Sequence, residues 1–277
     1  MIMPIAWIDG QWGSSSELKL PLQDRALQLA DGIFETILIL NQKPQLLGSH
    51  LRRWEQSASL LGMASPPDQN QLDDLIGEAI VRSGIENNPA ALRLNWSRGD
   101  SKQRGIDIDD GQPDKKQHRF WLEINPYPLI FSPLTTWVSR FEQRNAVSLL
   151  SRCKTFGYGQ NIQARREAKQ AGFDDAILRS TTGEVSCGSC ANILVYRQKS
   201  WLTPRLASGC LPGIMRQRAL DCGLVQEAVL NVIPEPGDEW LLINSLSCRP
   251  ISLVNTSSLT LGQEVQGLWQ SLLKPGP

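Results

Sequence analysis

Hydrophobic and polar residues in the first half of the chain follow two different spacings. Between Ser49 and Gly62, large apolar residues recur every three or four positions, as on one face of a helix. Ser49 suits the N-cap and Gly62 the stop, so we predict a helix between them. A second helix fits residues 72–80. Stretches rich in β-branched and aromatic residues predict strands at residues 33–40, 91–96 and 119–124, and Asp9-Gly10 predicts a hairpin turn.

The second half of the chain continues this mixture. Its spacing predicts helices at residues 160–171 and 214–222, each followed by a glycine that suits a helix end. Strands are predicted at residues 136–140, 176–178, 192–196 and 240–243. Because both halves mix helices with hairpin-connected strands, we expect an α+β fold with mixed, largely antiparallel sheets rather than a doubly wound parallel sheet.

Two stretches interrupt the pattern. Residues 98–117 are rich in Gly, Asp, Lys and Ser and predict a long exposed loop, either a lid or a disordered insertion. Residues 125–133 hold three prolines, and such extended segments commonly join domains. A chain of 277 residues is long enough for two cores. We therefore predict a smaller N-terminal α/β domain at residues 1–125, a linker at residues 126–133 and a larger C-terminal domain at residues 134–277.

Composition and charge narrow the functional classes. Apolar residues make up 41% of the chain, and 28 basic residues balance 28 acidic ones. No segment combines basic patches with interleaved aromatic residues, so we expect no nucleic-acid partner. The longest apolar runs, such as residues 37–40, are far too short to span a bilayer, and no signal-peptide apolar region develops before Asp9. We expect a soluble cytoplasmic protein without a membrane partner.

The cysteines allow one further site to be weighed. Six cysteines in a chain of this length do not suggest a disulfide framework, and a reduced compartment is the simpler interpretation. Cys187 and Cys190 form a C-x-x-C pair, which can be half of a zinc site or a redox pair. No second such pair exists, and His50 and His118 stand alone in the sequence. We therefore expect no bound metal, and we do not favour a redox role for this cysteine pair either.

Several short motifs follow one another along the chain. They read DRALQLADGIFET at residues 24–36, HLRR at 50–53, RCKTFGY at 152–158, GEVSCGSCANI at 183–193, TPR at 203–205 and GIMRQ at 213–217. Together they resemble the class IV aminotransferases, pyridoxal-phosphate enzymes of the D-amino-acid and branched-chain aminotransferase fold. The resemblance covers nearly the whole chain and implies that two-domain fold, with the cofactor bound by the C-terminal domain. It also implies a homodimer whose loops complete each other's sites.

The resemblance carries three site residues over to this chain. It implies that Lys154 binds pyridoxal 5'-phosphate as a Schiff base, which requires an amine that is neutral part of the time. Arg53 is implied as a ligand of the cofactor phosphate, for which a planar guanidinium with five donors is well suited. Tyr158 falls near the position where relatives place a residue beside the ring hydroxyl of the cofactor. A core tyrosine is the alternative interpretation there.

Two more phosphate contacts follow from the resemblance. Ile214 and Met215 begin a predicted helix, where free backbone N–H groups bind anions. Relatives with Thr at the position of Met215 add a hydroxyl contact that this chain lacks. Ser245 lies in a segment that resembles the second phosphate loop of the family. Without the resemblance, that segment would be interpreted as a turn at a strand end.

The largest departure from the family pattern is Cys187. Relatives have a glutamate here, whose carboxylate keeps the pyridine nitrogen of the cofactor protonated and makes the ring a strong electron sink. Glu184 lies three residues earlier. A neutral thiol cannot stabilise a charged ring nitrogen as an ion pair does, and a thiolate would require a strongly lowered pKa. Because α,β-elimination expels a leaving group as the carbanion forms, it demands less of the sink than transamination, and Cys187 favours a lyase.

Two other motifs indicate which lyase. Residues 203–205 and 213–217 resemble the aminodeoxychorismate lyase branch of the family. This resemblance implies a small-molecule substrate, 4-amino-4-deoxychorismate, and the products 4-aminobenzoate and pyruvate, in folate precursor synthesis. In that reaction Lys154 removes the hydrogen on the amine-bearing carbon, and formation of an aromatic ring supplies the driving force.

The substrate carries two carboxylates, so cationic side chains should line its site. Arg93, Arg104 and Arg205 are the candidates by motif position, and for each the alternative is a surface charge. Ile106 stands where the family usually has a tyrosine, so the tyrosine hydroxyl available to relatives is absent here.

Two other functions stay open. An aminotransferase acting on branched-chain or D-amino acids fits the family, but Cys187 and the TPR motif disfavour it. A pyridoxal-phosphate-binding protein without catalysis is favoured by the missing glutamate and tyrosine. The retained Lys154 and phosphate-binding candidates argue against that second alternative.

Overall fold

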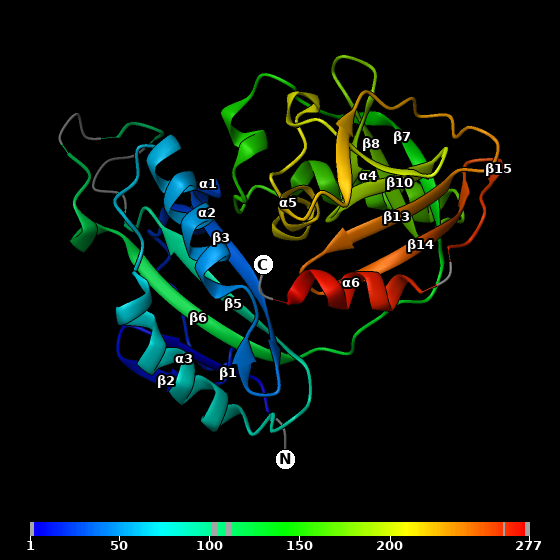
Figure 1. Cartoon of the computed structure of the whole chain (residues 1–277). Coiled ribbons are helices and arrows are strands. Elements are labelled where there is room, and N and C mark those ends of the chain that lie inside the picture. The colour runs from blue at the N-terminus through cyan, green and yellow to red at the C-terminus, as the bar shows by residue number, and fades with distance from the viewer. Residues whose placement is uncertain (1–2, 101–104, 109–111, 263, 275–277) are drawn as a thin grey trace. The chain divides into compact units, whose positions relative to one another are not determined.

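The chain is organised in two compact units (Figure 1). The computed structural model describes residues 3–100, 105–108, 112–262 and 264–274. The first unit comprises Met1–Pro128 and Lys154–Gly157, and the second comprises Leu129–Cys153 and Tyr158–Pro277. Lys154–Gly157 thus packs with the first unit, although these residues follow the proline-rich stretch in sequence. Which unit binds a cofactor stays a prediction.

The first unit is built on an antiparallel sheet. Its strand order is β2-β1-β6-β5-β3-β4. The strands are β1 (Ile5–Ile8), β2 (Gln11–Gly13), β3 (Gly32–Leu40), β4 (Lys43–Pro44), β5 (Ala90–Ser97) and β6 (Arg119–Pro126). The strands expected at residues 33–40, 91–96 and 119–124 are therefore confirmed. The hairpin expected at Asp9-Gly10 joins β1 to β2.

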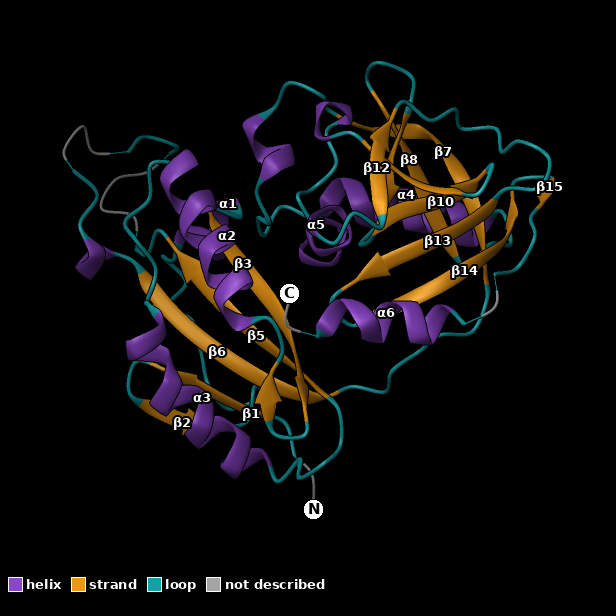
Figure 2. Cartoon of the chain, in the orientation of Figure 1, coloured by secondary structure: helices purple, strands orange, loops and turns teal. Residues whose placement is uncertain are grey.

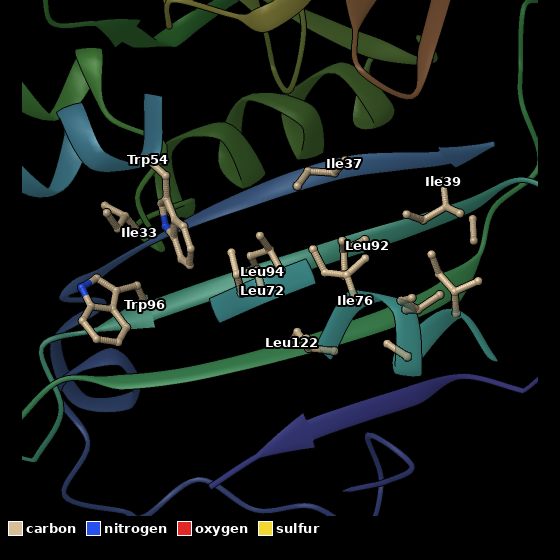
Figure 3. Close-up of a cluster of buried hydrophobic side chains, with 14 of the residues drawn as sticks. Ile33, Ile37, Ile39, Trp54, Leu72, Ile76, Leu92, Leu94, Trp96 and Leu122 are labelled. Atoms are coloured by element: carbon tan, nitrogen blue, oxygen red, sulfur yellow. The ribbon is translucent and has the colours of Figure 1, made fainter. Parts of the chain in front are cut away.

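Two helices cover one face of this sheet and complete its core. They are α2 (Leu47–Leu60) and α3 (Gln69–Ser83), and a shorter helix, α1 (Arg25–Leu29), precedes β3. Figure 3 shows alternate side chains of the strands, such as Ile37 and Leu92, packing against Trp54 of α2 and Ile76 of α3. Alternation along β3 points Phe34 toward the opposite face of the sheet.

The start of α2 differs from the prediction. The helix begins before Ser49, so Ser49 is not its N-cap. Leu46 occupies that position with a left-handed backbone, φ 54°, and no side chain caps the helix. In contrast, Asp68 and Gln71 form a reciprocal capping box at the start of α3, and Gly84 ends that helix in the left-handed conformation.

The second unit contains a mixed sheet (Figure 2). Its strand order is β12-β11-β10-β13-β14-β7-β8-β9, and β15 pairs with β14. The strands are β7 (Leu134–Arg144), β8 (Asp175–Ser180), β9 (Val185–Gly188), β10 (Asn192–Arg197), β11 (Ser200–Pro204), β12 (Val225–Ala228), β13 (Glu239–Asn244), β14 (Ser247–Val254) and β15 (Ser257–Ser258). The described pairings are mostly antiparallel, and the pairings of β11 with β12 and of β7 with β8 and β14 are parallel. The α+β fold with mixed sheets is confirmed.

Helices and short 3-10 turns complete this architecture. The helices of the second unit are α4 (Gly159–Gln170), α5 (Ile214–Asp221) and α6 (Val265–Leu273). Single 3-10 turns are formed by Lys115–Gln117, Leu149–Arg152 and Leu206–Ser208. Within the described ranges, no helix is both long and apolar enough to cross a membrane.

Candidate active site

The backbone of Lys154 is fixed beside β3. The Phe34 N–H donates to the Lys154 carbonyl at 2.9 Å, and the Phe156 N–H donates to the Gly32 carbonyl at 3.0 Å. The Phe156 ring packs directly over Gly32, where an added Cβ would lie 2.1 Å from the ring. Gly32 is therefore required because the aromatic ring occupies the space of a side chain. Two hydrogen bonds and one buried contact hold the lysine segment on the strand.

Two cationic side chains share the ring of Phe34. The Lys154 Nζ lies 4.3 Å from the ring centroid, and the Arg93 Cζ lies 3.6 Å from it. The face of an aromatic ring attracts cations at such distances. The Arg93 Nε also donates to Asn95 Oδ1 at 2.7 Å. The structure thus brings Lys154 and Arg93, both predicted from the sequence, onto one aromatic side chain.

Arg53 lies in a buried charged cluster with Glu35 and His50. Its Nε and Nη2 donate to the two carboxylate oxygens of Glu35 at 2.8 and 2.5 Å, and His50 Nδ1 lies 2.7 Å from Glu35 Oε2. Burial alone would raise the pKa of Glu35, but the Arg53 charge and the His50 hydrogen bond outweigh it and lower that pKa to about 2. Glu35 is therefore ionised at neutral pH and balances the charge of Arg53.

His50 connects this cluster to Lys154. Burial lowers the pKa of His50, and although Glu35 acts in the opposite direction, the positive charges of Arg53 and Lys154 lower it further. A neutral imidazole at pH 7 is the result. Lys154 and Arg53 therefore lie within electrostatic reach of the same histidine.

In the second unit, a β-bulge determines which side chains accompany Cys187. Leu178 pairs with Cys187 and Arg179 with Val185, so β9 has one extra residue, Ser186, between these pairs. The Ser180 N–H donates to the Glu184 carbonyl at 2.7 Å, which extends the ladder by one pair. Because the bulge reverses the alternation, Glu184 and Cys187 lie on the same face of β9.

The charge of Glu184 is compensated by Arg205. The Arg205 Nε lies 3.2 Å from Glu184 Oε1, and the Thr182 hydroxyl lies 3.3 Å from the same oxygen. Glu184 is buried, whereas the side chain of Arg205 is 45% exposed. Arg205 thus binds the carboxylate of Glu184, which lies three residues before Cys187, the position where relatives have a glutamate.

Cys187 itself carries no charge at neutral pH. Its side chain is buried with Leu178 of β8 and Cys210 in one apolar cluster. Burial raises the pKa of the Cys187 thiol to about 11, although nearby Arg144 acts in the opposite direction. The lowered pKa that a thiolate would require is absent, so the position holds a neutral thiol.

The predicted phosphate ligands of the second unit lie at two chain turns. Gly213 caps α5, and an added Cβ there would lie 1.9 Å from Asn192 Oδ1, while the Asn192 amide donates to the Leu211 carbonyl at 2.9 Å. These contacts fix the first turn of α5, where the N–H groups of Ile214 and Met215 have no acceptor within the helix.

Ser245 lies in the turn between β13 and β14. The Asn244 side chain shapes this turn by accepting the N–H groups of Leu246 and Ser247 at 2.8 and 2.9 Å. Tyr158 occupies the N-cap position of α4. Contact of these residues with a phosphate or a ring hydroxyl stays a prediction.

The remaining points concern Arg104, the absence of a metal expected from the sequence, and three side chains near Lys154 and Arg53 that the sequence did not mark as site residues. Arg104 lies outside the described residues. No group of three His, Cys, Asp or Glu side chains suited to a metal gathers in the described parts of the chain. The three unpredicted side chains are those of Phe34, Glu35 and Asn95. Phe34 and Glu35 could have been found because they lie inside the motif at residues 24–36, whereas the signal for Asn95 is a polar residue in a mostly apolar strand.

Comparisons with known proteins give matches over most of the chain. The family model described as Amino-transferase class IV matches residues 32–254. Branched-chain-amino-acid aminotransferase-like protein 2 of Arabidopsis thaliana is 25% identical over 240 residues, which are 82% of this chain and 40% of that longer protein. Aminodeoxychorismate lyase of Bacillus subtilis is 23% identical over 255 residues, 90% of this chain and 86% of that protein.

Solved structures give the same fold. A fold IV-transaminase from Curtobacterium pusillum superimposes with a TM-score of 0.83 at 20% identity, over 99% of this chain and 100% of that chain. At that identity the similarity concerns the fold alone.

Proposed function

The chain belongs to the class IV aminotransferase family, and from this we propose that it is a pyridoxal-phosphate-dependent 4-amino-4-deoxychorismate lyase. It cleaves its substrate into 4-aminobenzoate and pyruvate for folate precursor synthesis. The family and its fold confirm the resemblance noted in the sequence. Both aminotransferases and aminodeoxychorismate lyases occur among the similar proteins, so the choice between them depends on the residues of this chain.

The residues present fit the proposed cofactor in their donor chemistry. Lys154 offers an amine for the aldehyde, and Arg53, whose charge Glu35 balances, offers guanidinium donors for the phosphate. The N–H groups of Ile214 and Met215 and the hydroxyl of Ser245 offer further phosphate donors. Tyr158 is proposed to lie beside the ring hydroxyl. When bound, pyridoxal phosphate supplies an electron-withdrawing imine that acidifies the C–H bond next to the substrate amine.

The observation that carries the choice of lyase is the neutral thiol of Cys187. A pKa of about 11 leaves no negative charge at this position at neutral pH, and the Glu184 carboxylate is compensated by Arg205. Without an anionic partner, a protonated ring nitrogen is less favoured by about 1.4 kcal/mol for each pKa unit lost. Elimination tolerates this loss better than transamination because the leaving group departs with the electron pair.

The side chains of the first unit take the remaining roles in this proposal. The Lys154 amine accepts the proton from the amine-bearing carbon. The C–O bond to the neighbouring carbon then breaks, and the enolpyruvate that leaves gains a proton at its methylene carbon to become pyruvate. Arg93, on the same Phe34 ring as Lys154, binds a substrate carboxylate and so orients the reacting carbon.

A two-substrate assay tests the proposal. Purified protein loaded with pyridoxal phosphate is given 4-amino-4-deoxychorismate, and 4-aminobenzoate fluorescence and pyruvate are followed. A parallel assay supplies branched-chain or D-amino acids with 2-oxoglutarate and measures glutamate. Lyase products alone support the proposal, and glutamate alone replaces it with an aminotransferase. If neither product forms while the cofactor absorbance band of the lysine imine is normal, the chain binds cofactor without catalysis.

We also propose a cytoplasmic homodimer. The second unit exposes large apolar side chains close together in sequence, which are Phe141, Val147, Leu149 and Leu150. Exposed apolar groups of this kind commonly mark protein interfaces. No disulfide joins any of the six cysteines, all of which lie in the described residues, as expected in a reducing compartment.

A further inference from the structure

A buried amide lies among three aromatic rings on the face of the first sheet that α2 and α3 do not cover. Asn95 of β5 is 1% exposed and pairs directly with Phe34 of β3 and with Trp121 of β6. Figure 1 shows β5 between these two strands. The ring of Phe156 stacks on Phe34 at 6.0 Å between centroids and lies 5.5 Å from the Trp121 ring. Phe156 therefore bridges the two rings that flank Asn95.

An amide in this position is costly for the fold. Burying a polar group is unfavourable unless hydrogen bonds replace those it made with water. The Asn95 Nδ2 reaches the Trp121 carbonyl only at 3.4 Å, a long contact. The strong interaction is made by Oδ1, which accepts the Arg93 Nε at 2.7 Å. A charge-assisted bond to Arg93 is thus the main interaction of this amide.

Two contacts help to hold the Arg93 guanidinium in place. Asn95 holds its Nε, and the Phe34 ring supports its Cζ at 3.6 Å from the centroid. A guanidinium that is already oriented loses less conformational entropy when it binds a carboxylate. Lys154 Nζ lies 4.3 Å from the same centroid, so both cations border the ring of Phe34.

We propose that Asn95 is a positioning residue that holds Arg93 over the ring of Phe34 and selects a substrate whose carboxylate is attached to a planar unsaturated ring. The rings of Phe34, Phe156 and Trp121 supply flat apolar surfaces beside the guanidinium, which suit a planar ring better than a flexible aliphatic chain. This inference rests on the proposed function, in which Arg93 binds a substrate carboxylate.

The test compares two substitutions of Asn95 with a matched control in the cofactor-loaded protein. Asn95→Leu keeps the size and removes the acceptor, whereas Asn95→Asp keeps an acceptor oxygen. Asn125→Leu is the control, because Asn125 lies on the same sheet face and its amide makes a long contact with Glu123 Oε2 at 3.5 Å. The measurements are the Kd of 4-aminobenzoate and of its uncharged analogue 4-aminobenzamide, KM and kcat for 4-amino-4-deoxychorismate, and Tm.

Asn95→Leu is expected to raise the Kd of 4-aminobenzoate and the KM about 10-fold, the loss of one hydrogen bond to a charged group. It should leave kcat and the Kd of 4-aminobenzamide unchanged and should not lower Tm, because an apolar side chain replaces a buried amide. Asn95→Asp keeps the acceptor but adds a negative charge beside Arg93, so it should also weaken binding of 4-aminobenzoate and leave the Kd of 4-aminobenzamide unchanged. Asn125→Leu should have no effect. An unchanged Kd in Asn95→Leu overturns the inference, as does a loss of kcat that follows a fall in Tm.

Arg93→Gln separates this inference from the proposed function. If Arg93→Gln leaves the Kd of 4-aminobenzoate unchanged, the proposed role of Arg93 fails. If Arg93→Gln weakens binding and Asn95→Leu does not, the inference alone fails. When Asn95→Leu is added to Arg93→Gln, no further loss is expected, and a second loss of equal size shows that Asn95 does not act through Arg93. The binding measurements give these outcomes even when the lyase assay shows no turnover.

Discussion

At the scale of single residues, the neutral thiol of Cys187 separates the two reactions open to the family. Cys187→Glu places a carboxylate where the buried thiol now lies and is expected to raise aminotransferase side activity at least about 10-fold, since each pKa unit gained by the ring nitrogen corresponds to a factor of ten. Cys187→Ser, which adds no charge, is the matched control. Glutamate formation from amino acid and 2-oxoglutarate measures the effect, and equal rates in both variants contradict the argument.

Glu35 gives the first unit a characteristic dependence on pH. Its pKa falls from 4.5 to about 2 on folding, so the stability it contributes is present above pH 4.5 and is lost as the pH falls toward 2. The pKa of His50 is lowered from 6.5, so its contribution also decreases as the pH falls below 6.5. Acidification therefore acts on both residues in the same direction.

Glu35→Gln should remove the part of this dependence that lies below pH 4.5. The free energy of unfolding, measured in denaturant at pH 7, is expected to fall by on the order of 3 kcal/mol, because the buried Arg53 loses its partner. Between pH 4.5 and pH 2, where the parent protonates Glu35, Glu35→Gln should lose less stability than the parent does. Glu123→Gln, on a half-buried strand position, serves as the control. A parallel decrease in parent and Glu35→Gln over this range would rule out the assigned role of the cluster.

At the scale of elements, the contact of Gly32 with Phe156 determines where Lys154 lies. Gly32→Ala puts a methyl group 2.1 Å from the Phe156 ring, so the Lys154 segment must shift away from β3. We expect a loss of about 1–3 kcal/mol in unfolding free energy, as in other overpacked cores, together with weaker cofactor binding. Adding Phe156→Ala should restore part of the stability.

Gly77→Ala provides the comparison for that prediction. Gly77 lies within α3 with no atom near an added Cβ, so alanine should stabilise the protein by about 0.5–1 kcal/mol. Chemical denaturation measures both variants. Equal stability of Gly32→Ala and the parent would show that the Phe156 contact does not hold the segment.

The elements that the sequence predicts well are those whose pattern is local. β3, β5 and β6 alternate or are strongly apolar, and the helices of both units show clear spacing. β9 was missed because its residues, VSCG, are small and polar and are buried only by pairing with β8. β14 was missed because it contains Arg249 and Pro250, and a proline inside a strand obscures the pattern.

The candidate site also contains residues that the sequence identifies and contacts that it does not. Lys154, Arg53 and Cys187 stand in recognisable motifs, so the sequence identifies them and the chemistry that they suggest. The support around them depends on distant contacts, such as Phe156 on Gly32 and Arg93 on Phe34, which are far apart in sequence. The β-bulge that turns Glu184 to the face of Cys187 likewise has no signal in a single chain, since it depends on how β8 and β9 pair.

At the scale of the whole molecule, the exposed apolar residues of the second unit test the proposed dimer. Val147→Asp is expected to convert a dimer into monomers, because Val147 is 88% exposed and a charge there cannot be buried cheaply. Val81→Asp, at a 78% exposed position on α3, is the matched control and should leave the dimer intact. Light scattering after size exclusion reports the mass, and a dimeric Val147→Asp would refute this choice of surface.

The return of Lys154–Gly157 to β3 has a consequence for biosynthesis. A ribosome synthesises the chain from its N-terminus, and all the strands of the first sheet have been synthesised once Pro126 has been added. The edge of β3 beside Gly32 nevertheless gains its pairing and its aromatic contact only from residues made later, after β7 of the second unit. During translation this edge of β3 therefore stays unpaired until Lys154–Gly157 has emerged from the ribosome and binds to it.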